Sequence, residues 1–508
     1  MSDSGNTARP VVTVRDGAVR GIGRGDTAAF FGIPFAAPPI GRLRYLAPAA
    51  PASWEGVRDA SAPGPTPLRF SQEQQPMVPE TPVPGDSILN VNVFAPAPID
   101  PAAGLPVLVW IHGGGYTAGS PTSPWYDGRR FAGDGVVTVT MSYRLGFDGF
   151  GFVDGAPLNR GLLDQIAALA WVRDNIAAFG GDPDRVTLAG QSAGGGSVLA
   201  LLSAPAARGL FHQAVVQSGV LSRMTPERAR EHTRALGALL GVEGTDLPAW
   251  RAVDETTVLE QLPALTEQVA AAAVPTSIEE FVDRIVDPYA DLLGMALTPV
   301  VDGETLLGFE DAVAAGFHRG IALLIGTTAH EFVTTADNDA APRTAARALR
   351  GHGVYPETAQ RFLDDAAALG PNRVTGQLVA EARFRRPAVQ VVAARGAAGE
   401  GERTWMYDFR HRSPVVGAAA HCHEIPYVWD LLGAPGVSAR LGEHPPQSLA
   451  DTMHYDWVAF VTDGRCAWPA TTTLGRGAMI YDATPSFTPD GYQLDWELAA
   501  HGAQHGHD

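Results

Sequence analysis

Residues 185–194 read Arg-Val-Thr-Leu-Ala-Gly-Gln-Ser-Ala-Gly, and this stretch decides the fold. Its first half, Arg185 to Ala189, has the apolar and β-branched character of a buried strand. The pentapeptide Gly190-Gln191-Ser192-Ala193-Gly194 follows, and a Gly-rich helix start comes next. A G-x-S-x-G pattern between a strand and a helix holds its serine on a sharp, strained turn. We therefore expect Ser192 to be a nucleophile, with the Ala193 N–H at the helix start facing a developing oxyanion.

A second glycine motif follows another apolar run. Residues 110–116 read Trp-Ile-His-Gly-Gly-Gly-Tyr, at the end of the predicted strand Leu105 to Ile111. Successive glycines leave backbone N–H groups free to approach a ligand oxygen, as an H-G-G-G oxyanion loop does. The N–H groups of Gly114 and Gly115 are the candidate donors. The alternatives are a plain glycine turn and a dinucleotide loop, but the segment lacks the G-x-G-x-x-G spacing of the latter.

Apolar strands alternate with helical stretches through much of the chain. Such strands, buried on both faces, are typical of a mainly parallel sheet covered by helices. Pro226 to Leu293 has helical spacing and is expected to be a helical insertion. The predicted strands are Leu105 to Ile111, Val136 to Ser142, Val186 to Ala189, Val215 to Gln217, Ala322 to Gly326 and Trp405 to Phe409, with helices at Leu162 to Ala177 and Ser197 to Leu202.

Composition narrows the function classes. The 508 residues are 45% hydrophobic and 18% charged, with a formal net charge of −18, which fits a globular protein and argues against a nucleic-acid partner. All 37 basic residues counted as Lys or Arg are arginine, which excludes Walker A loops, Schiff-base chemistry and S-x-x-K hydrolases. Two cysteines, a polar start and no apolar run of about 18 residues favour a cytoplasmic protein without membrane attachment.

Motifs along nearly the whole chain resemble the type-B carboxylesterases, the cholinesterase-like branch of the α/β-hydrolase fold. They include Gly32-Ile33-Pro34-Phe35-Ala36, Ser142-Tyr143-Arg144-Leu145-Gly146, Asn159-Arg160-Gly161-Leu162-Leu163-Asp164-Gln165 and Phe179-Gly180-Gly181-Asp182-Pro183, besides the two glycine motifs. The resemblance implies an α/β-hydrolase fold with a central, mainly parallel β-sheet flanked by helices. It also implies one catalytic domain over residues 1–508, with helical insertions at about 226–295 and 335–400 capping the active-site gorge, and a polar tail at 500–508.

The resemblance also implies the partners of Ser192. In Gly326-Thr327-Thr328-Ala329-His330-Glu331 the family's acid falls on Glu331, and in His421-Cys422-His423-Glu424 its base falls on His421. Cys422 replaces the family's glycine, so His423 stays a competing base. The acid would fix the tautomer of the histidine and stabilise the imidazolium. Without the family, the same cluster could belong to a metal site, although the companion zinc motifs are missing.

Other positions are carried over as supporting residues. Gln191 and Ser218 are expected beside the triad, and Arg144 with Asp164 as a structural ion pair. Arg44 would belong to a second pair whose usual glutamate falls at Gly85. Gln191 stands where choline-selective members have glutamate, and residues 70–90 contain no tryptophan for stacking, so choline esters are not expected substrates.

These observations predict a serine carboxylesterase with a Ser192–His421–Glu331 triad, an oxyanion hole of Gly114, Gly115 and Ala193, and no metal or organic cofactor. The expected partner is a small-molecule ester, and the expected assembly is a monomer or small homo-oligomer. Two alternatives remain: a transacylase or specialised esterase for a natural-product or bulky aromatic ester, and, from another class, a cholinesterase-like binding protein without catalysis.

Overall fold

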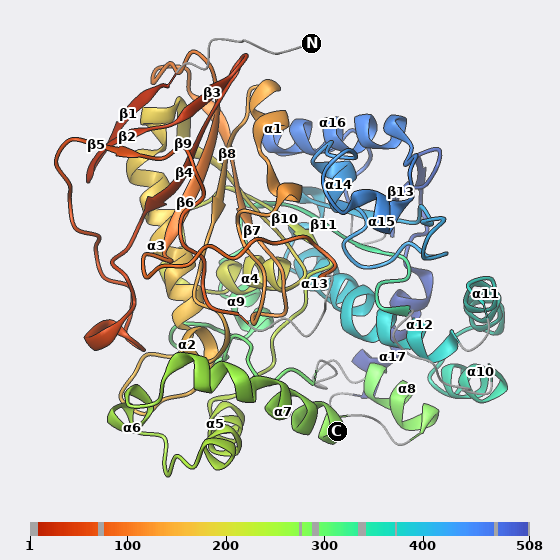
Figure 1. The fold of residues 1–508 in the computed structure, drawn as a ribbon. Coiled ribbons are helices and arrows are strands. Elements are labelled where there is room, and N and C mark those ends of the chain that lie inside the picture. Colours follow the sequence, from red (N-terminus) through yellow and green to blue (C-terminus); the bar gives the residue numbers. More distant parts are fainter. Residues whose placement is uncertain are drawn as a thin grey trace.

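The computed structural model describes residues 9–69, 76–273, 277–286, 294–333, 342–370, 373–471 and 476–505. Within them one sheet has eleven strands in the order β14-β13-β12-β11-β10-β9-β7-β8-β6-β4-β3 (Figure 1). Strands β7 to β13 pair in parallel, while the pairs that involve β3, β4, β6 and β14 are antiparallel. The strands are β3 Ile22–Arg24, β4 Thr27–Pro34, β6 Asn90–Pro96, β7 Leu105–Ile111, β8 Val137–Met141, β9 Gly181–Gln191, β10 Gln213–Gln217, β11 Ala322–Thr328, β12 Thr404–Phe409, β13 Ala478–Tyr481 and β14 Ser486–Thr488.

A smaller sheet covers one corner of the molecule. Its strands are β1 Val11–Val14, β2 Gly17–Arg20 and β5 Val57–Asp59, with β1 and β2 antiparallel and β2 and β5 parallel. Apart from β5 and the short 3-10 helix η1 (Gly41–Leu43), the described residues 35–69 and 76–84, which are rich in proline, form no helix or strand.

Helices pack on both faces of the large sheet, and β7 shows why. Val107, Val109 and Ile111 belong to one hydrophobic core, which also holds apolar residues of α3 and α4. The alternate residues Leu108 and Trp110 belong to a second core with α16. Successive side chains of a strand point to opposite faces, so a strand that is apolar throughout requires cover on both.

The helices have the following bounds. Those before β11 are α1 Arg129–Gly133, α2 Gly146–Phe150, α3 Arg160–Asn175, α4 Ala193–Leu202, α5 Pro226–Leu240, α6 Leu247–Arg251, α7 Glu255–Ala273, α8 Ile278–Val286 and α9 Phe309–Ala314. After β11 come α10 Pro342–Gly351, α11 Pro356–Ala367, α12 Val374–Ala380, the π-helical segment η6 Glu381–Arg385, α13 Arg386–Ala397, α14 Ile425–Val428, α15 Val437–Leu441, α16 Gln447–Asp463 and α17 Gln493–His505.

Both predicted insertions are helical where the structure describes them. Helices α5, α6 and α7 lie together along one side of the molecule, beyond the sheet, while α8 packs against α10 and α17 (Figure 1). Residues 274–276, 287–293, 335–341 and 371–372 of the two predicted insertions lie outside the described residues. Helix α17 extends through residues 500–505 of the predicted polar tail, and residues 506–508 lie outside the description.

Two buried ion pairs connect segments of the chain that follow β4 and β8. Arg144 donates to Asp164 at 2.7 and 2.8 Å, with both side chains almost fully buried, as the sequence predicts. Arg44 donates to Asp148 at 2.9 and 3.0 Å. Asp148, which sequence reasoning did not single out, thus supplies the carboxylate that Gly85 cannot. Searched across the described residues, no helix combines the length and the apolar character that a bilayer crossing requires.

Candidate active site

The turn between β9 and α4 holds Ser192 in a conformation that few L-residues adopt. Its φ is +58° and its ψ is −123°. The flanking glycines are required by space: a Cβ on Gly190 would lie 2.5 Å from the backbone of Gly194, and one on Gly194 would lie 2.0 Å from the Ile111 carbonyl oxygen. The Ser192 N–H donates to the Gln217 carbonyl at 2.9 Å, which ties the turn to β10. The sequence thus places a strained serine at the carboxyl edge of the sheet.

The glycine loop after β7 lies against this turn. A Cβ on Gly113 would meet the Gln191 carbonyl oxygen at 2.8 Å, so only glycine permits the approach. Gly114 and Gly115 have φ values of +117° and +61°, and the Gly114 carbonyl accepts from the N–H groups of residues 117 and 118. The predicted donors Gly114, Gly115 and Ala193 line one cavity together with Ser192.

Glu331 follows β11, two strands from the serine. Its side chain is fully buried, and its carboxylate accepts from the Ser218 hydroxyl at 2.7 Å and the Thr328 N–H at 2.9 Å. Nδ1 of His421 contacts the same carboxylate. Three donors therefore converge on one buried carboxylate, including the predicted neighbour Ser218.

His421 comes from the loop after β12. Its backbone N–H donates to the Glu331 carbonyl at 3.0 Å, so the acid and histidine loops are joined along the chain as well as through their side chains. The rings of Phe332 and Phe384 pack on the imidazole with centroids 4.4 and 4.9 Å away. Burial alone would lower the pKa of His421, but the neighbouring Cys422 and the Glu331 carboxylate together raise it well above the usual imidazole value.

The far nitrogen of His421 faces a glutamine. Nε2 lies 3.3 Å from Nε2 of Gln191, and within the described residues no hydrogen bond joins it to Ser192. The Cys422 thiol donates to Oε1 of Gln191 at 3.4 Å, which turns the amide N–H₂ toward the imidazole. This orientation suits a neutral histidine that carries its proton on Nδ1.

The backbone at Cys422, the position where the resemblance places a glycine, has a conformation that suits glycine. Cys422 has a φ of +69°, a region that glycine enters without cost. Burial raises the pKa of its thiol, so it remains protonated at neutral pH. His423 turns away from the pocket: its Nδ1 accepts from the Ala420 N–H at 3.3 Å, and burial lowers its pKa to about 4. The structure thus places His421, not its competitor His423, against Glu331.

The cavity that holds Ser192 and His421 has a volume of about 430 Å³. One wall is apolar and includes Met295, Phe332 and Phe384; Glu80 and Arg383 also line the cavity. Among the described residues, no group of three or more His, Cys, Asp or Glu side chains could hold a metal ion. The site therefore offers a hydroxyl, an imidazole, a carboxylate and backbone N–H groups.

A serine on a strand-to-helix turn at the carboxyl edge of a mainly parallel sheet defines an α/β-hydrolase. The sequence model of the Carboxylesterase family matches residues 8–477, and the chain belongs to this family. It is 34% identical over 491 residues to the para-nitrobenzyl esterase of Bacillus subtilis (strain 168), covering 93% of this chain and 95% of that one. It is 32% identical to the fumonisin B1 esterase of Sphingopyxis macrogoltabida, covering 93% and 88%.

Solved structures agree with this assignment. A PNB esterase structure superposes with a TM-score of 0.79 at 33% identity, covering 97% of this chain and 99% of the other. The chain is a carboxylic-ester hydrolase.

Sequence reasoning missed two parts of this site. Neither the aromatic pair Phe332 and Phe384 nor the contact of Cys422 with Gln191 was predicted. The two phenylalanines come from segments about fifty residues apart, and no spacing rule links them. The cysteine, however, gave a signal, because it stands where the family has glycine.

Proposed function

We propose that ester hydrolysis proceeds through an acyl-enzyme on Ser192. The serine Oγ attacks the ester carbonyl carbon, and its proton passes to Nε2 of His421. The carbonyl oxygen becomes an oxyanion that accepts from the N–H groups of Gly114, Gly115 and Ala193. His421 then protonates the leaving alcohol oxygen as the C–O bond breaks. Water repeats the steps, releasing the acid and restoring the serine.

One observation carries this proposal: Nδ1 of His421 contacts the buried Glu331 carboxylate, while the same imidazole lines the cavity of Ser192. A fixed carboxylate holds the proton on Nδ1 and leaves Nε2 free to act as a base. For catalysis, Nε2 must exchange the Gln191 amide for the serine hydroxyl. Gln191 and Ser192 are adjacent in the turn, and we propose that rotation of side chains makes this exchange.

The pocket supports a compact ester as substrate. A volume of about 430 Å³ and a wall of aromatic and methionine side chains suit an apolar or aromatic group on the ester. We propose that the two helical insertions form a cap over this pocket, since Arg383 and Phe384 come from the second of them. We propose a monomer or small homo-oligomer as the working form.

A specialised esterase is the second candidate. The fumonisin B1 esterase, named for a natural product, covers nearly the whole chain at 32% identity. The same chemistry would serve a natural-product ester, or an acyl transfer if an alcohol replaced water in the second half of the reaction.

The nucleophile is tested by Ser192→Ala and by trapping. The variant should lose ester turnover by several orders of magnitude and keep its melting temperature, since little packing is lost. Wild-type protein treated with diethyl p-nitrophenyl phosphate should carry one phosphoryl adduct, located on Ser192 by peptide mass spectrometry. An adduct on another serine, or an active alanine variant, would contradict the assignment. A series of p-nitrophenyl esters graded by acyl length then separates the compact-ester proposal from the bulky natural-product alternative.

A further inference from the structure

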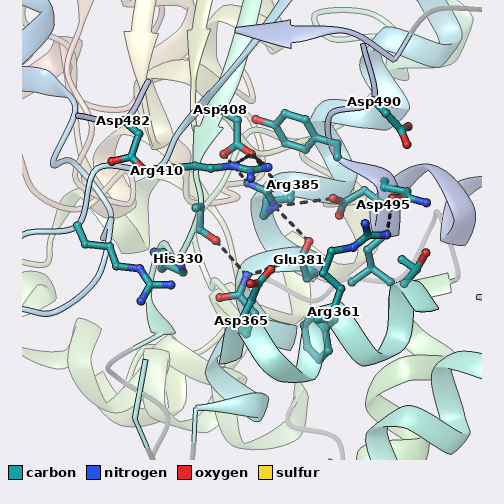
Figure 2. A pocket seen from close by; sticks show the side chains of 18 residues that line it. His330, Arg361, Asp365, Glu381, Arg385, Asp408, Arg410, Asp482, Asp490 and Asp495 are labelled. Atoms are coloured by element: carbon teal, nitrogen blue, oxygen red, sulfur yellow. Dashed lines mark hydrogen bonds and ion pairs between the residues drawn. The ribbon is translucent and has the colours of Figure 1, made fainter. Parts of the chain in front are cut away.

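A cluster of buried charged side chains lies behind the acid loop, residues 329–333, and takes no part in the reaction as proposed. Figure 2 shows Arg385 at its centre, with Asp408 to one side and Glu381 and Asp495 to the other. Asp408 belongs to β12, which precedes the histidine, and the loop itself follows β11, which precedes the acid. Arg385 links the cluster to both strands.

Arg385 reaches this place from a π-helical turn. Segments α12, η6 and α13 follow one another without a break, and the Arg386 N–H donates to the Glu381 carbonyl five residues earlier, which is the bond of a π turn. Pro387 accompanies this turn, because in a regular α-helix its ring would clash with the carbonyl of Arg383. Such turns are rare and frequently occur at functional sites. The side chains of this one are therefore candidates for a role in the reaction.

The π turn divides its side chains between two sides of the acid loop. Phe384 lines the active-site pocket and packs on His421, with ring centroids 4.9 Å apart. The next residue, Arg385, lines a separate cavity of about 310 Å³ behind the loop. One turn of helix thus contacts the histidine on one side and the strands that carry the triad on the other.

Arg385 joins the carboxyl ends of β11 and β12. Its two terminal nitrogens donate to the Asp408 carboxylate at 2.9 and 3.2 Å, and Asp408 pairs with Thr327 in the register of the two strands. Nη1 also donates to the Thr327 hydroxyl at 3.3 Å and to the Thr328 carbonyl at 3.4 Å. A planar guanidinium holds its donors in fixed directions, so its bonds to one strand set the position of the other.

Tyr492 closes the same junction. The Arg385 guanidinium lies over its ring, 4.2 Å from the centroid. The Tyr492 hydroxyl accepts from the Thr327 N–H at 3.0 Å and donates to the Tyr407 carbonyl of β12 at 2.7 Å. One hydroxyl therefore bridges backbone groups of both strands, at the point where they diverge into the acid loop and the histidine loop.

Thr328, the last residue of β11, carries this position on to Glu331. The Thr328 N–H donates to the Glu331 carboxylate at 2.9 Å, and the Thr328 hydroxyl accepts from the Glu331 N–H at 3.1 Å. Glu331 has a φ of +33°, a strained conformation that persists only where the surroundings enforce it. A shift of Thr328 would therefore move the carboxylate relative to His421.

We propose that Arg385 and Tyr492 are positioning residues for ester hydrolysis: they fix the ends of β11 and β12 and thereby the contact between Glu331 and His421. The inference rests on the proposed function, in which this contact keeps the histidine proton on Nδ1. Neither residue is among the described residues that line the active-site pocket, so each acts through the triad and not on the ester. Loss of either should lower kcat and leave KM nearly unchanged.

Arg385→Lys keeps the positive charge but loses the planar fork that reaches both strands. We expect its kcat for p-nitrophenyl acetate to fall about tenfold to a hundredfold, since a misplacement of about 1 Å can cost a hundredfold. The matched control is Arg395→Lys on the same continuous helix. Arg395 is also buried, but it donates to the Ile321 carbonyl and the Thr404 hydroxyl, at the amino ends of the two strands. This control should keep the wild-type kcat, whatever its melting temperature.

The pH–rate profile separates a positioning role from a general loss of structure. Burial lowers the pKa of His421, while Cys422 and Glu331 raise it above its usual value. A looser contact with Glu331 should therefore move the acid limb of Arg385→Lys down by about half a pH unit or more. A smaller active fraction alone leaves the limb in place. The other titratable neighbours of His421 have no hydrogen bond to Arg385 in the described part of the chain, so they affect both proteins alike: His423 and Glu424.

A double-mutant cycle links the effect to the acid. If Arg385 acts through Glu331, then Arg385→Lys should cost less than about threefold further activity in a Glu331→Gln background. Tyr492→Phe provides a second test should Arg385→Lys fail to fold. Its control is Tyr481→Phe, because the buried Tyr481 hydroxyl donates to Asp456 at 2.6 Å, away from the acid loop. An undiminished loss in the Glu331→Gln background, or an unmoved acid limb in folded variants, would overturn the inference.

Glu331→Gln alone distinguishes the failure of the two proposals. If this variant stays active, the triad proposal fails and the positioning role fails with it. If it loses activity while folded Arg385→Lys and Tyr492→Phe match the wild type in kcat and in the acid limb, only the positioning role fails. Titration of the active variants with diethyl p-nitrophenyl phosphate gives the fraction of competent enzyme, so that each kcat refers to folded protein.

Discussion

Replacing Glu331 with glutamine removes one negative charge at nearly constant shape, in the best-defined contact of the site. The carboxylate accepts from three donors: the Ser218 hydroxyl, the Thr328 N–H and Nδ1 of His421. A glutamine amide has a single oxygen, and its N–H₂ group must face one of these donors. The Ser218 hydroxyl can rotate and accept, but neither Thr328 N–H nor an Nδ1–H can. The variant therefore keeps the fold only by rearranging the bond to His421.

Two contributions set the size of the expected fall in kcat/KM. A hydrogen bond between a charged and a neutral partner contributes about 1.5–3 kcal/mol, and this part is lost as the imidazolium forms. Loss of the correct tautomer in a serine–histidine–acid site costs about 10⁴-fold in rate when the acid becomes its amide. We expect kcat/KM of Glu331→Gln to fall by about 10³–10⁴-fold, which is about 4–5.5 kcal/mol of transition-state stabilisation.

The assay is the steady-state hydrolysis of p-nitrophenyl acetate, with the melting temperature measured on the same samples. Glu310→Gln is the matched control, because Glu310 is also paired, with Arg223 at 2.8 Å, but does not line the active-site pocket. This control should retain wild-type kcat/KM. A folded Glu331→Gln variant within about tenfold of the wild type would show that the carboxylate neither orients nor stabilises His421, and the triad proposal would fail.

Three further predictions concern the neighbouring loop. His421→Ala should reduce kcat/KM by orders of magnitude and His423→Ala far less, because only the first contacts Glu331; equal losses would leave no basis for assigning the base. The acid limb of the pH–rate profile should lie above pH 6.5, since the pKa of His421 is raised. Gln191→Glu should move this limb up by about one to three further pH units, because it places a carboxylate near Nε2 of His421. A limb that does not move in this variant would contradict the contact between Gln191 and His421. Burial raises the pKa of Glu424 from 4.5 to about 7, so folding stability is lost as pH rises through that range. Glu424→Gln should avoid about 3 kcal/mol of this loss, measured by denaturation of both proteins at low and high pH. A difference in free energy of unfolding between variant and wild type that stays constant across pH would disprove this prediction.

The strands and the turn that holds Ser192 could be predicted because their signals are local. Apolar runs such as Leu105 to Ile111 must be buried on both faces, and the glycines around Ser192 have no room for a Cβ. The positions of Glu331 and His421 came from motif resemblance. Their contact is long-range and became visible only through the parallel register of β11 and β12.

The ion pairs of Arg385 could not be predicted for the same reason. Its partners Asp408, Glu381 and Asp495 come from β12, η6 and α17, and no residue pattern indicates that they will lie together. The partner of Arg44 was missed because the family position is a glycine here, and the charge was supplied by Asp148, about a hundred residues away. Burial of charge requires compensation, but it does not specify which part of the chain provides it.

The register of β9, β10, β11 and β12 has a consequence for how this enzyme can diversify. These strands are neighbours in the sheet, and Ser192, Glu331 and His421 follow three of them at one edge. Strand spacing of about 4.8 Å sets the separation of the reactive loops, so they can shift only if the sheet itself changes. The pocket wall at Arg383 and Phe384 belongs to a separate helical segment. Exchange of that segment between relatives should transplant substrate preference while the chemistry stays in place, which makes it the natural unit for recombination in directed evolution.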